Sequence, residues 1–134
     1  CFTLAAHLLS HTDTLVVATG IAVVFKRDAT ASWGAAKTLA ELYGDRFILG
    51  LGVSAPAANA RRGILYEKPY SFMKEYLTKM KDMLYTAPAP PKDPPIVLAA
   101  LRPKMLQLAA TETHGTHTYF VPPAQTAAAT NGCK

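Results

Sequence analysis

An unbroken apolar run from Phe47 to Val53 contains two glycines, Gly50 and Gly52, and ends at Ser54. A strand that is buried on both faces carries continuous apolar residues, which is typical of parallel sheets covered by helices. Glycines near the carboxyl end of such a strand let a ligand approach the backbone closely. Folds of the α/β class place their chemistry at these strand ends. The run therefore predicts an α/β protein whose ligand site lies where this strand ends.

The rest of the chain alternates between short apolar segments and segments with helical periodicity. Apolar residues every three or four positions, with proline near a start or glycine near an end, predict the helices. Short apolar runs rich in β-branched residues predict the strands. Helices are expected over residues 2–11, 30–43, 69–85 and 103–112, strands over 15–21, 46–53, 96–101 and 117–121, and a long loop over 55–66. Four such alternations favour parallel strands joined by right-handed crossovers, in either a barrel segment or an open doubly wound sheet.

Size and composition limit the kinds of protein this can be. With 134 residues, half of them apolar, the chain can fill the core of a single domain. Its net charge of +5 comes from scattered Lys and Arg, so nucleic acid is not an expected partner. No stretch approaches the roughly 20 apolar residues that span a bilayer, so no membrane segment is expected. Cys1 and Cys133 do not form the pattern of a disulfide framework, so reduced thiols and a cytoplasmic location are expected.

Four motifs follow one another along the chain: Val17–Ile21, Leu39–Leu42, Arg46–Ser54 and Leu98–Leu106. Their order and spacing resemble the luciferase-like monooxygenase family, above all the branch that uses the deazaflavin coenzyme F420. The resemblance runs from about Phe2 to Pro122 and implies a partial (β/α)8 TIM barrel made of about four parallel strands and their helices. Because the chain starts without Met and family members are roughly twice as long, we expect residues 1–134 to be one domain that lacks the first and last strands.

The resemblance also implies an oxidoreductase activity. Hydride would pass between the cofactor, F420 or alternatively FMN, and a small organic substrate. The cofactor would lie across the carboxyl ends of the strands, with its phosphate in the turn after the third strand, where backbone N–H groups and a helix N-terminus favour an anion. The residues implied are Thr19, Gly20 and Ala22 beside the ring system, Gly52, Val53 and Ser54 as the neighbouring wall, and Ala99, Ala100, Arg102 and Pro103 around the phosphate.

Three positions depart from the family pattern. Arg102 stands where the family usually has glycine, which permits backbone conformations that arginine does not. Two outcomes are open: the guanidinium of Arg102 either donates paired hydrogen bonds to the phosphate or blocks the turn that would bind it. His114 replaces the usual Asp before Gly115, and Ala55 stands where a polar residue or His is common. No catalytic residue is therefore assigned, and residues from Gln125 onward are expected to leave the family pattern.

Several conspicuous residues also have ordinary structural explanations. Glycines in a buried strand can accommodate a crossing helix rather than a ligand. The pairs His7 and His11, and His114 and His117, have no further ligand nearby, so a helix surface and a turn before a strand are favoured over a metal site. Residues at helical spacing are expected in the core rather than around a cofactor; they are Trp33, Tyr43, Phe72, Tyr76, Met73, Met80, Met83 and Met105.

Two other functions stay open from the sequence. A truncated and catalytically inactive fragment would have open sheet edges and would act at most as an association module, for instance as a homodimer. A compact flavodoxin-like sheet that binds a nucleotide would differ from a barrel segment in its strand order.

Overall fold

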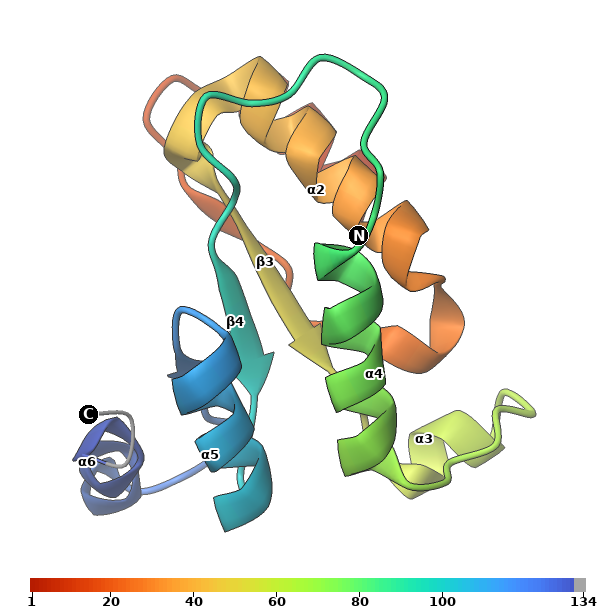
Figure 1. Ribbon diagram of the computed structural model, residues 1–134. Coiled ribbons are helices and arrows are strands. Elements are labelled where there is room, and N and C mark those ends of the chain that lie inside the picture. The colour runs from red at the N-terminus through yellow and green to blue at the C-terminus, as the bar shows by residue number, and fades with distance from the viewer. Residues whose placement is uncertain (132–134) are drawn as a thin grey trace.

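The computed structural model describes residues 1–131, in which parallel strands alternate with helices (Figure 1). The helices are α1 (Phe2–Ser10), α2 (Ala29–Tyr43), α3 (Pro56–Ala60), α4 (Pro69–Lys81), α5 (Pro103–Glu112) and α6 (Pro123–Asn131). The strands are β1 (Val17–Ala18), β2 (Ala22–Val23), β3 (Phe47–Gly52), β4 (Ile96–Ala99) and β5 (Thr116–His117), and 3-10 turns cover Val24–Lys26 and Gly44–Arg46.

All strand pairs among the described residues are parallel, with β3 at their centre. β1 pairs with the first half of β3, where Val17 lies opposite Phe47, and β2 pairs with its second half, where Val23 lies opposite Gly52. β4 pairs with the other edge of β3, and β5 follows β4. The order along the sheet thus repeats the order along the chain. Such an order suits a barrel segment and lacks the reversal of a doubly wound sheet.

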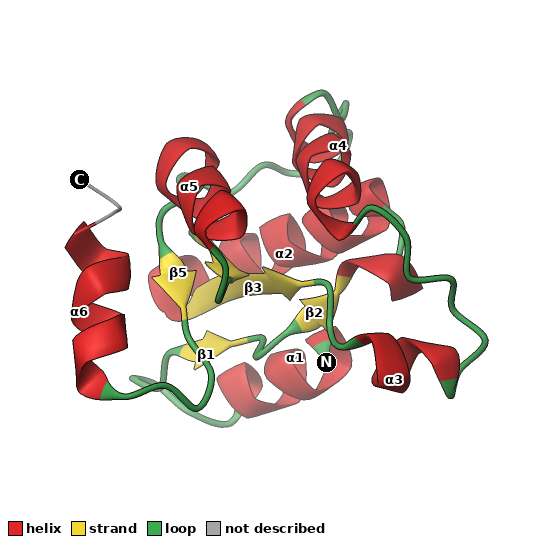
Figure 2. Cartoon of the chain, turned by 90° about the horizontal axis from the view of Figure 1, so that it is seen from below, coloured by secondary structure: helices red, strands yellow, loops and turns green. Residues whose placement is uncertain are grey.

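The helices lie around the outside of a curled sheet. Figure 2 shows α4 and α5 above the sheet, α2 behind β3 and α1 below β1, and α1 also contacts α2. The expectation of a partial barrel with about four strand positions is confirmed, since β1 and β2 occupy successive parts of one position beside β3.

The hydrophobic core lies between the outer face of β3 and the helices. Phe47, Leu49 and Leu51 are fully buried there, and the ring of Phe47 lies 6.1 Å from that of Phe2 on α1. The helices contribute the buried side chains Trp33, Leu39, Met73, Tyr76 and Met80. Helical spacing therefore predicted these core positions correctly, although Phe72 is 37% exposed.

Several elements differ in extent from the sequence-based expectation. Of the expected strand 15–21 only Val17–Ala18 forms a strand, β1, whereas β2 lies just beyond it, and the peptide bond between Gly20 and Ile21 is cis. The expected loop 55–66 begins with α3, where Pro56 occupies the first turn and alanines favour a helix. Helix α4 ends at Lys81 rather than near residue 85. β4 ends at Ala99, and β5 covers only Thr116–His117, because pairing extends no further.

The caps of α2 confirm why this helix was the clearest in the sequence. The Asp28 carboxylate accepts hydrogen bonds from the backbone N–H groups of Thr30 and Ala31 and from the Thr30 hydroxyl. These bonds, with that of the Thr30 hydroxyl foremost, hold the pKa of Asp28 below its usual range. At the other end, Gly44 has φ of 67°, a left-handed conformation that glycine adopts readily.

Within residues 1–131, no helix combines the length and apolar character that a membrane span requires. Cys1 is an exposed free thiol, and Cys133 lies outside the described residues.

Candidate functional site

The carboxyl ends of the strands meet at one edge of the sheet. The register places Val23 opposite Gly52 and Ala99 opposite His117. A Cβ atom built on Gly52 would lie 3.1 Å from the Cβ of Ala99, so these two residues are neighbours as well. Val23, Gly52, Ala99 and His117 therefore form one row across the sheet. Residues in one row point to the same face, here the inner face opposite the helix-packed Leu51 and Leu98.

The two glycines of β3 accommodate a neighbouring segment of the chain. A Cβ atom on Gly50 would lie 1.8 Å from the backbone oxygen of Thr19. One on Gly52 would lie 2.1 Å from Cδ1 of Ile21. Gly50 is thus required by the segment that joins β1 to β2, and the side chain of Ile21 fills the space over Gly52, so close approach of a ligand is not needed to explain either glycine. The sequence analysis considered a crossing helix at these glycines, and in the structure a loop lies there instead.

Thr19 ties that segment to β3 through its side chain. Its hydroxyl donates a hydrogen bond to the oxygen of Gly50 at 2.8 Å and accepts one from the nitrogen of Gly50 at 2.9 Å. The hydroxyl thereby replaces the strand pairing that is interrupted between β1 and β2. Thr19 is 3% exposed and Ala22 is buried against the core, whereas Gly20 is exposed. Of these three residues, which were predicted to lie beside the ring system, only Gly20 is exposed, so it alone presents its backbone to the surface.

The segment after β3 turns sharply at Ser54. Ser54 has φ of 62°, a left-handed conformation that is unusual for residues other than glycine. Asn59 on α3 is completely buried, and its amide nitrogen donates to the oxygen of Val53 at 2.9 Å. Asn59 therefore holds the predicted wall residues Val53 and Ser54 in place. The sequence analysis did not single out Asn59, because an asparagine in an alanine-rich segment carries no motif.

The turn after β4 leads directly into α5. Ala99 and Ala100 are largely buried, and the N–H group of Ala100 donates to the oxygen of His117 at 3.4 Å. Arg102 precedes the helix with φ of −114° and ψ of 148°, and Pro103 occupies the first turn. This extended backbone is accessible to any residue, so the replacement of glycine by arginine causes no backbone strain here. The Arg102 side chain is exposed and makes no ion pair within residues 1–131.

His117 was expected to begin the strand 117–121 after a turn, and it is the last residue of β5. Its Nε2 atom is buried and has no hydrogen-bond partner in the described part of the chain. The oxygen Oδ1 of Asn59 is the other buried side-chain polar atom without a partner among these residues. Buried polar atoms are nearly always hydrogen-bonded, so each exception calls for an explanation. Both exceptions belong to segments at the carboxyl edge of the sheet.

The other histidines have structural positions. His7 and His11 are exposed on α1, with their rings 4.3 Å apart, as the interpretation of a helix surface requires. Nδ1 of His114 accepts a hydrogen bond from the backbone nitrogen of Ile96 at 3.1 Å, which fixes the turn before β5. No cluster of three potential metal ligands occurs within residues 1–131.

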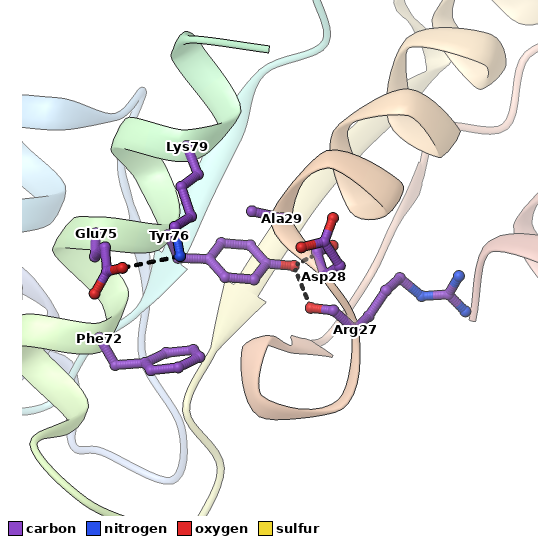
Figure 3. A pocket seen from close by; sticks show the side chains of 7 residues that line it. All are labelled: Arg27, Asp28, Ala29, Phe72, Glu75, Tyr76 and Lys79. Atoms are coloured by element: carbon purple, nitrogen blue, oxygen red, sulfur yellow. Dashed lines mark hydrogen bonds and ion pairs between the residues drawn. The ribbon is translucent and has the colours of Figure 1, made fainter.

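A cavity of about 80 Å³ lies between the start of α2 and α4 (Figure 3). Figure 3 shows Tyr76 pointing across it, where the hydroxyl of Tyr76 donates to the oxygen of Arg27 at 3.0 Å. The same hydroxyl lies 2.6 Å from Oγ of Ser32. Sites for drug-sized ligands have volumes of roughly 300–1,000 Å³, so this cavity is too small for a flavin or deazaflavin. The hydrogen bonds of Tyr76 in this cavity link α4 to the start of α2.

Comparison with known proteins places the chain among relatives of known class. A curated relative, the 5,10-methylenetetrahydromethanopterin reductase of Methanolobus tindarius, is 29% identical over 124 residues, covering 81% of this chain and 38% of the relative. The chain therefore spans about two-fifths of the length of that protein.

Solved structures show the same fold. The coenzyme F420 dependent tetrahydromethanopterin reductase of Methanopyrus kandleri matches 98% of this chain with a TM-score of 0.78 and 16% identity, and 48% of that protein is covered. An F420-dependent secondary alcohol dehydrogenase, solved with an F420-acetone adduct, matches 98% of this chain with a TM-score of 0.84 and 15% identity, again over 48% of its length. The chain thus corresponds to about half of these folds.

The sequence profile of the luciferase-like monooxygenases matches residues 1–133. This match extends beyond Pro122, so the expectation that the family pattern ends near Gln125 is wrong. The consecutive parallel strands, the external helices and this nearly complete match agree with one another. The chain belongs to the luciferase-like monooxygenase family.

Proposed function

We propose that this chain supplies part of the cofactor and substrate site of a coenzyme F420-dependent oxidoreductase. The observation that carries the proposal is that two of the predicted residues, Gly52 and Ala99, lie side by side in one row at the carboxyl edge of the sheet. The related proteins named above include F420-dependent enzymes, which favours the deazaflavin over FMN. FMN is the alternative cofactor.

The residues at this edge fit a flat cofactor with an anionic tail. Gly52 and Ala99 add little or no side chain to the inner row, and Ile21 covers Gly52, so a planar ring would lie against the Ile21 side chain and Ala99. Arg102 precedes α5 and is exposed, and no side chain caps the first turn of this helix. The helix dipole and a guanidinium together favour phosphate.

In this proposal, the residues of the chain bind and orient the cofactor. Thr19 fixes the 19–21 segment against β3, so that the exposed backbone at Gly20 forms one side of the site. Asn59 holds Val53 and Ser54 as the neighbouring wall. Ala99, Ala100 and Pro103 shape the turn in which Arg102 would hold phosphate. When bound, the deazaflavin supplies the hydride chemistry itself, and the protein contributes orientation and electrostatics.

The proposed reaction is hydride transfer between the cofactor and a small organic substrate. Because the chain covers less than half of the length of the relatives, the remaining walls of the site belong to parts that this chain does not contain. No residue of the described chain is assigned as a catalytic acid or base. The cytoplasmic location stays a prediction.

Fluorescence titration of the purified chain with oxidised F420, and with FMN in parallel, tests the proposal. We expect saturable binding of F420 that weakens about tenfold in Arg102→Ala, because one charge-assisted contact to phosphate is lost. Arg61→Ala is the matched control, since Arg61 is exposed on the loop after β3 and hydrogen-bonds only to the oxygen of Ala57 among the described residues. A folded chain that binds neither cofactor would overturn the proposal, and tighter binding by Arg102→Ala would show that Arg102 blocks the cradle.

A second candidate function is association through the open sheet. β1 and β5 lie at the two edges of the sheet within the described residues, and exposed apolar side chains lie next to them. Val16 is 53% exposed before β1, and Phe120 is 90% exposed after β5. Unpaired edges and apolar patches favour pairing with another chain, and a homodimer is the simplest case. Light scattering coupled to size-exclusion chromatography tests this, and a monomer at micromolar concentration would contradict it.

A further inference from the structure

The excess of cations over carboxylates is concentrated at the carboxyl edge of the sheet. Segments 24–28, 53–68 and 100–102 connect the ends of β2, β3 and β4 to α2, α4 and α5. Figure 1 shows these three helices beginning at the end of the molecule to which the arrowheads of β3 and β4 point. With the first two residues of each helix, the segments contain two carboxylates and seven exposed cations. The cations are Lys26 and Arg27 before α2, Arg61, Arg62 and Lys68 after β3, and Arg102 and Lys104 at the start of α5.

The amino edge of the sheet has the opposite balance of charge. Segments 11–16, 44–46, 82–95 and 113–115, each with the last two residues of the helix before it, contain three cations and five carboxylates. Two of these carboxylates are paired, Asp93 with Lys37 and Glu112 with Lys81. None of the seven cations of the carboxyl edge forms an ion pair within residues 1–131. Cations that are scattered along the sequence are thus gathered at one edge by the parallel topology and left without carboxylate partners.

The arrangement of these cations decides what kind of ligand they attract. Like charges on one surface repel one another, and their summed potential raises the local concentration of ions of opposite sign. Each exposed cation alone contributes little, because water and salt screen it. An anion with several charges interacts with several cations at once, whereas a single phosphate would need Arg102 alone. The cations surround the proposed ligand site, so a small organic molecule with several phosphate or carboxylate groups fits this edge best.

We propose that the seven cations form an electrostatic surface that draws small organic polyanions to the carboxyl edge, with Arg61, Arg62 and Lys68 acting at long range. This inference rests on the proposed function, since it names the charge of the ligand that the same edge takes. It gives the basic loop after β3 a role that requires no direct contact with the bound ligand. A long-range field acts on the encounter of ligand and protein, so the rate of association carries most of the effect.

Isothermal titration calorimetry with inorganic tripolyphosphate tests the charge of this edge without the cofactor. We expect saturable binding in about 10 mM NaCl, where charges act over roughly 30 Å, and binding at least about tenfold weaker in about 150 mM NaCl, where they act over roughly 8 Å.

The test variant combines Arg62→Gln with Lys68→Gln and should bind tripolyphosphate about three- to tenfold more weakly at low salt. The matched control combines Lys81→Gln with Lys92→Gln, which removes the same formal charge from the amino edge and should change the affinity less than about twofold. All four side chains are exposed, so both variants should fold. A single charge such as that of Arg61 should also change the affinity less than about twofold, so Arg61→Ala stays a suitable control in the F420 titration.

A second readout, stopped-flow fluorescence with oxidised F420, separates attraction at long range from contact. The association rate should fall about three- to tenfold in the carboxyl-edge variant, whereas the dissociation rate should stay within about twofold of the parent. An unchanged association rate would overturn the inference and leave the proposed function intact.

The tripolyphosphate results give three further outcomes. Equal losses in the two double variants would overturn the inference, because net charge rather than its position would then decide. Tighter binding of a single-stranded DNA oligonucleotide, with the same loss in the carboxyl-edge variant, would also overturn it, since the surface would then suit nucleic acid. Binding of tripolyphosphate with the expected losses, but no binding of F420 by the folded parent, would support the charge of the edge and overturn the cofactor assignment alone.

Discussion

The two faces of β3 pack in opposite ways. On the outer face, Phe47, Leu49 and Leu51 fill the space between the sheet and the helices with large apolar side chains. On the inner face, Gly50 and Gly52 have no side chains, and the segment from Thr19 to Ile21 lies against their backbone. Stability therefore comes from side-chain volume on one face and from the absence of side chains on the other. A single strand thus carries the core and the floor of the proposed site.

The first prediction tests the inner face with Gly50→Ala, for which we expect the largest effect. The new Cβ would lie 1.8 Å from the oxygen of Thr19, a backbone atom that cannot rotate away. We expect a loss of about 4 kcal/mol or more in the free energy of unfolding, measured by urea denaturation.

The matched control for Gly50→Ala is Gly34→Ala in α2. There the nearest atom to the new Cβ is Cε of Met83 at 3.5 Å, an ordinary contact. Since glycine weakens a helix interior, Gly34→Ala should stabilise the chain by about 0.5–1 kcal/mol. If the two substitutions have similar effects, the proposed contrast between the glycines is wrong.

The second prediction tests the outer face with Leu49→Ala. Leu49 is fully buried in the core, so its truncation should leave a cavity and cost about 3 kcal/mol. Its neighbour Ile48 points to the inner face and is only partly buried, so Ile48→Ala should cost about 1 kcal/mol. Equal losses in the two variants, measured by urea denaturation, would show that both faces are packed to the same degree.

The third prediction concerns the Thr19 hydroxyl, which binds the 19–21 segment to the backbone of β3. Thr19→Val preserves shape but removes both hydrogen bonds to Gly50, so a buried N–H and a buried carbonyl lose a partner. We expect a loss of about 2 kcal/mol in the free energy of unfolding. Thr19→Ser retains the hydroxyl and should lose much less. A Thr19→Val chain as stable as the parent would mean that the 19–21 segment does not depend on this contact.

The fourth prediction concerns the hydrogen bonds by which Tyr76 links α4 to the start of α2, and its effect is the smallest. Tyr76→Phe removes the hydrogen bonds to Arg27 and Ser32 and should cost about 1 kcal/mol at neutral pH. Burial, as the main cause, raises the pKa of Tyr76 above its ordinary value. The folded pKa thus exceeds the unfolded one, so the contribution of the neutral phenol is complete below about pH 10 and is lost as the pH rises through the folded pKa. The difference in stability between parent and Tyr76→Phe should therefore shrink above pH 10, and a constant difference would contradict this.

Much of the fold could be predicted because the signals are local. Helical spacing placed Trp33, Met73 and Tyr76 in the core, and Gly44 marked the end of α2. The continuous apolar run predicted the central parallel strand. The extents of the strands were less predictable, since a strand such as β5 ends where its partner stops pairing.

The candidate site was predictable only in outline. The resemblance named residues at the ends of the strands, of which Gly52 and Ala99 are neighbours in the structure, and their role in a site stays a prediction. It did not reveal Asn59 or the orientation of His117, because neither residue belongs to a motif. The extended backbone at position 102 shows that arginine causes no strain there, and whether Arg102 holds or blocks the phosphate stays a prediction.

The sequence by itself determined the alternation of strands and helices, the division of the helices into buried and exposed faces, and membership of the family. These follow from periodicity and from motifs that lie within single segments. Only the tertiary structure decided why Gly50 and Gly52 are required and which histidine lies beside Ala99. Both depend on the register between strands that are about 30 residues or less apart along the chain, and register is set by packing over that distance rather than by local sequence.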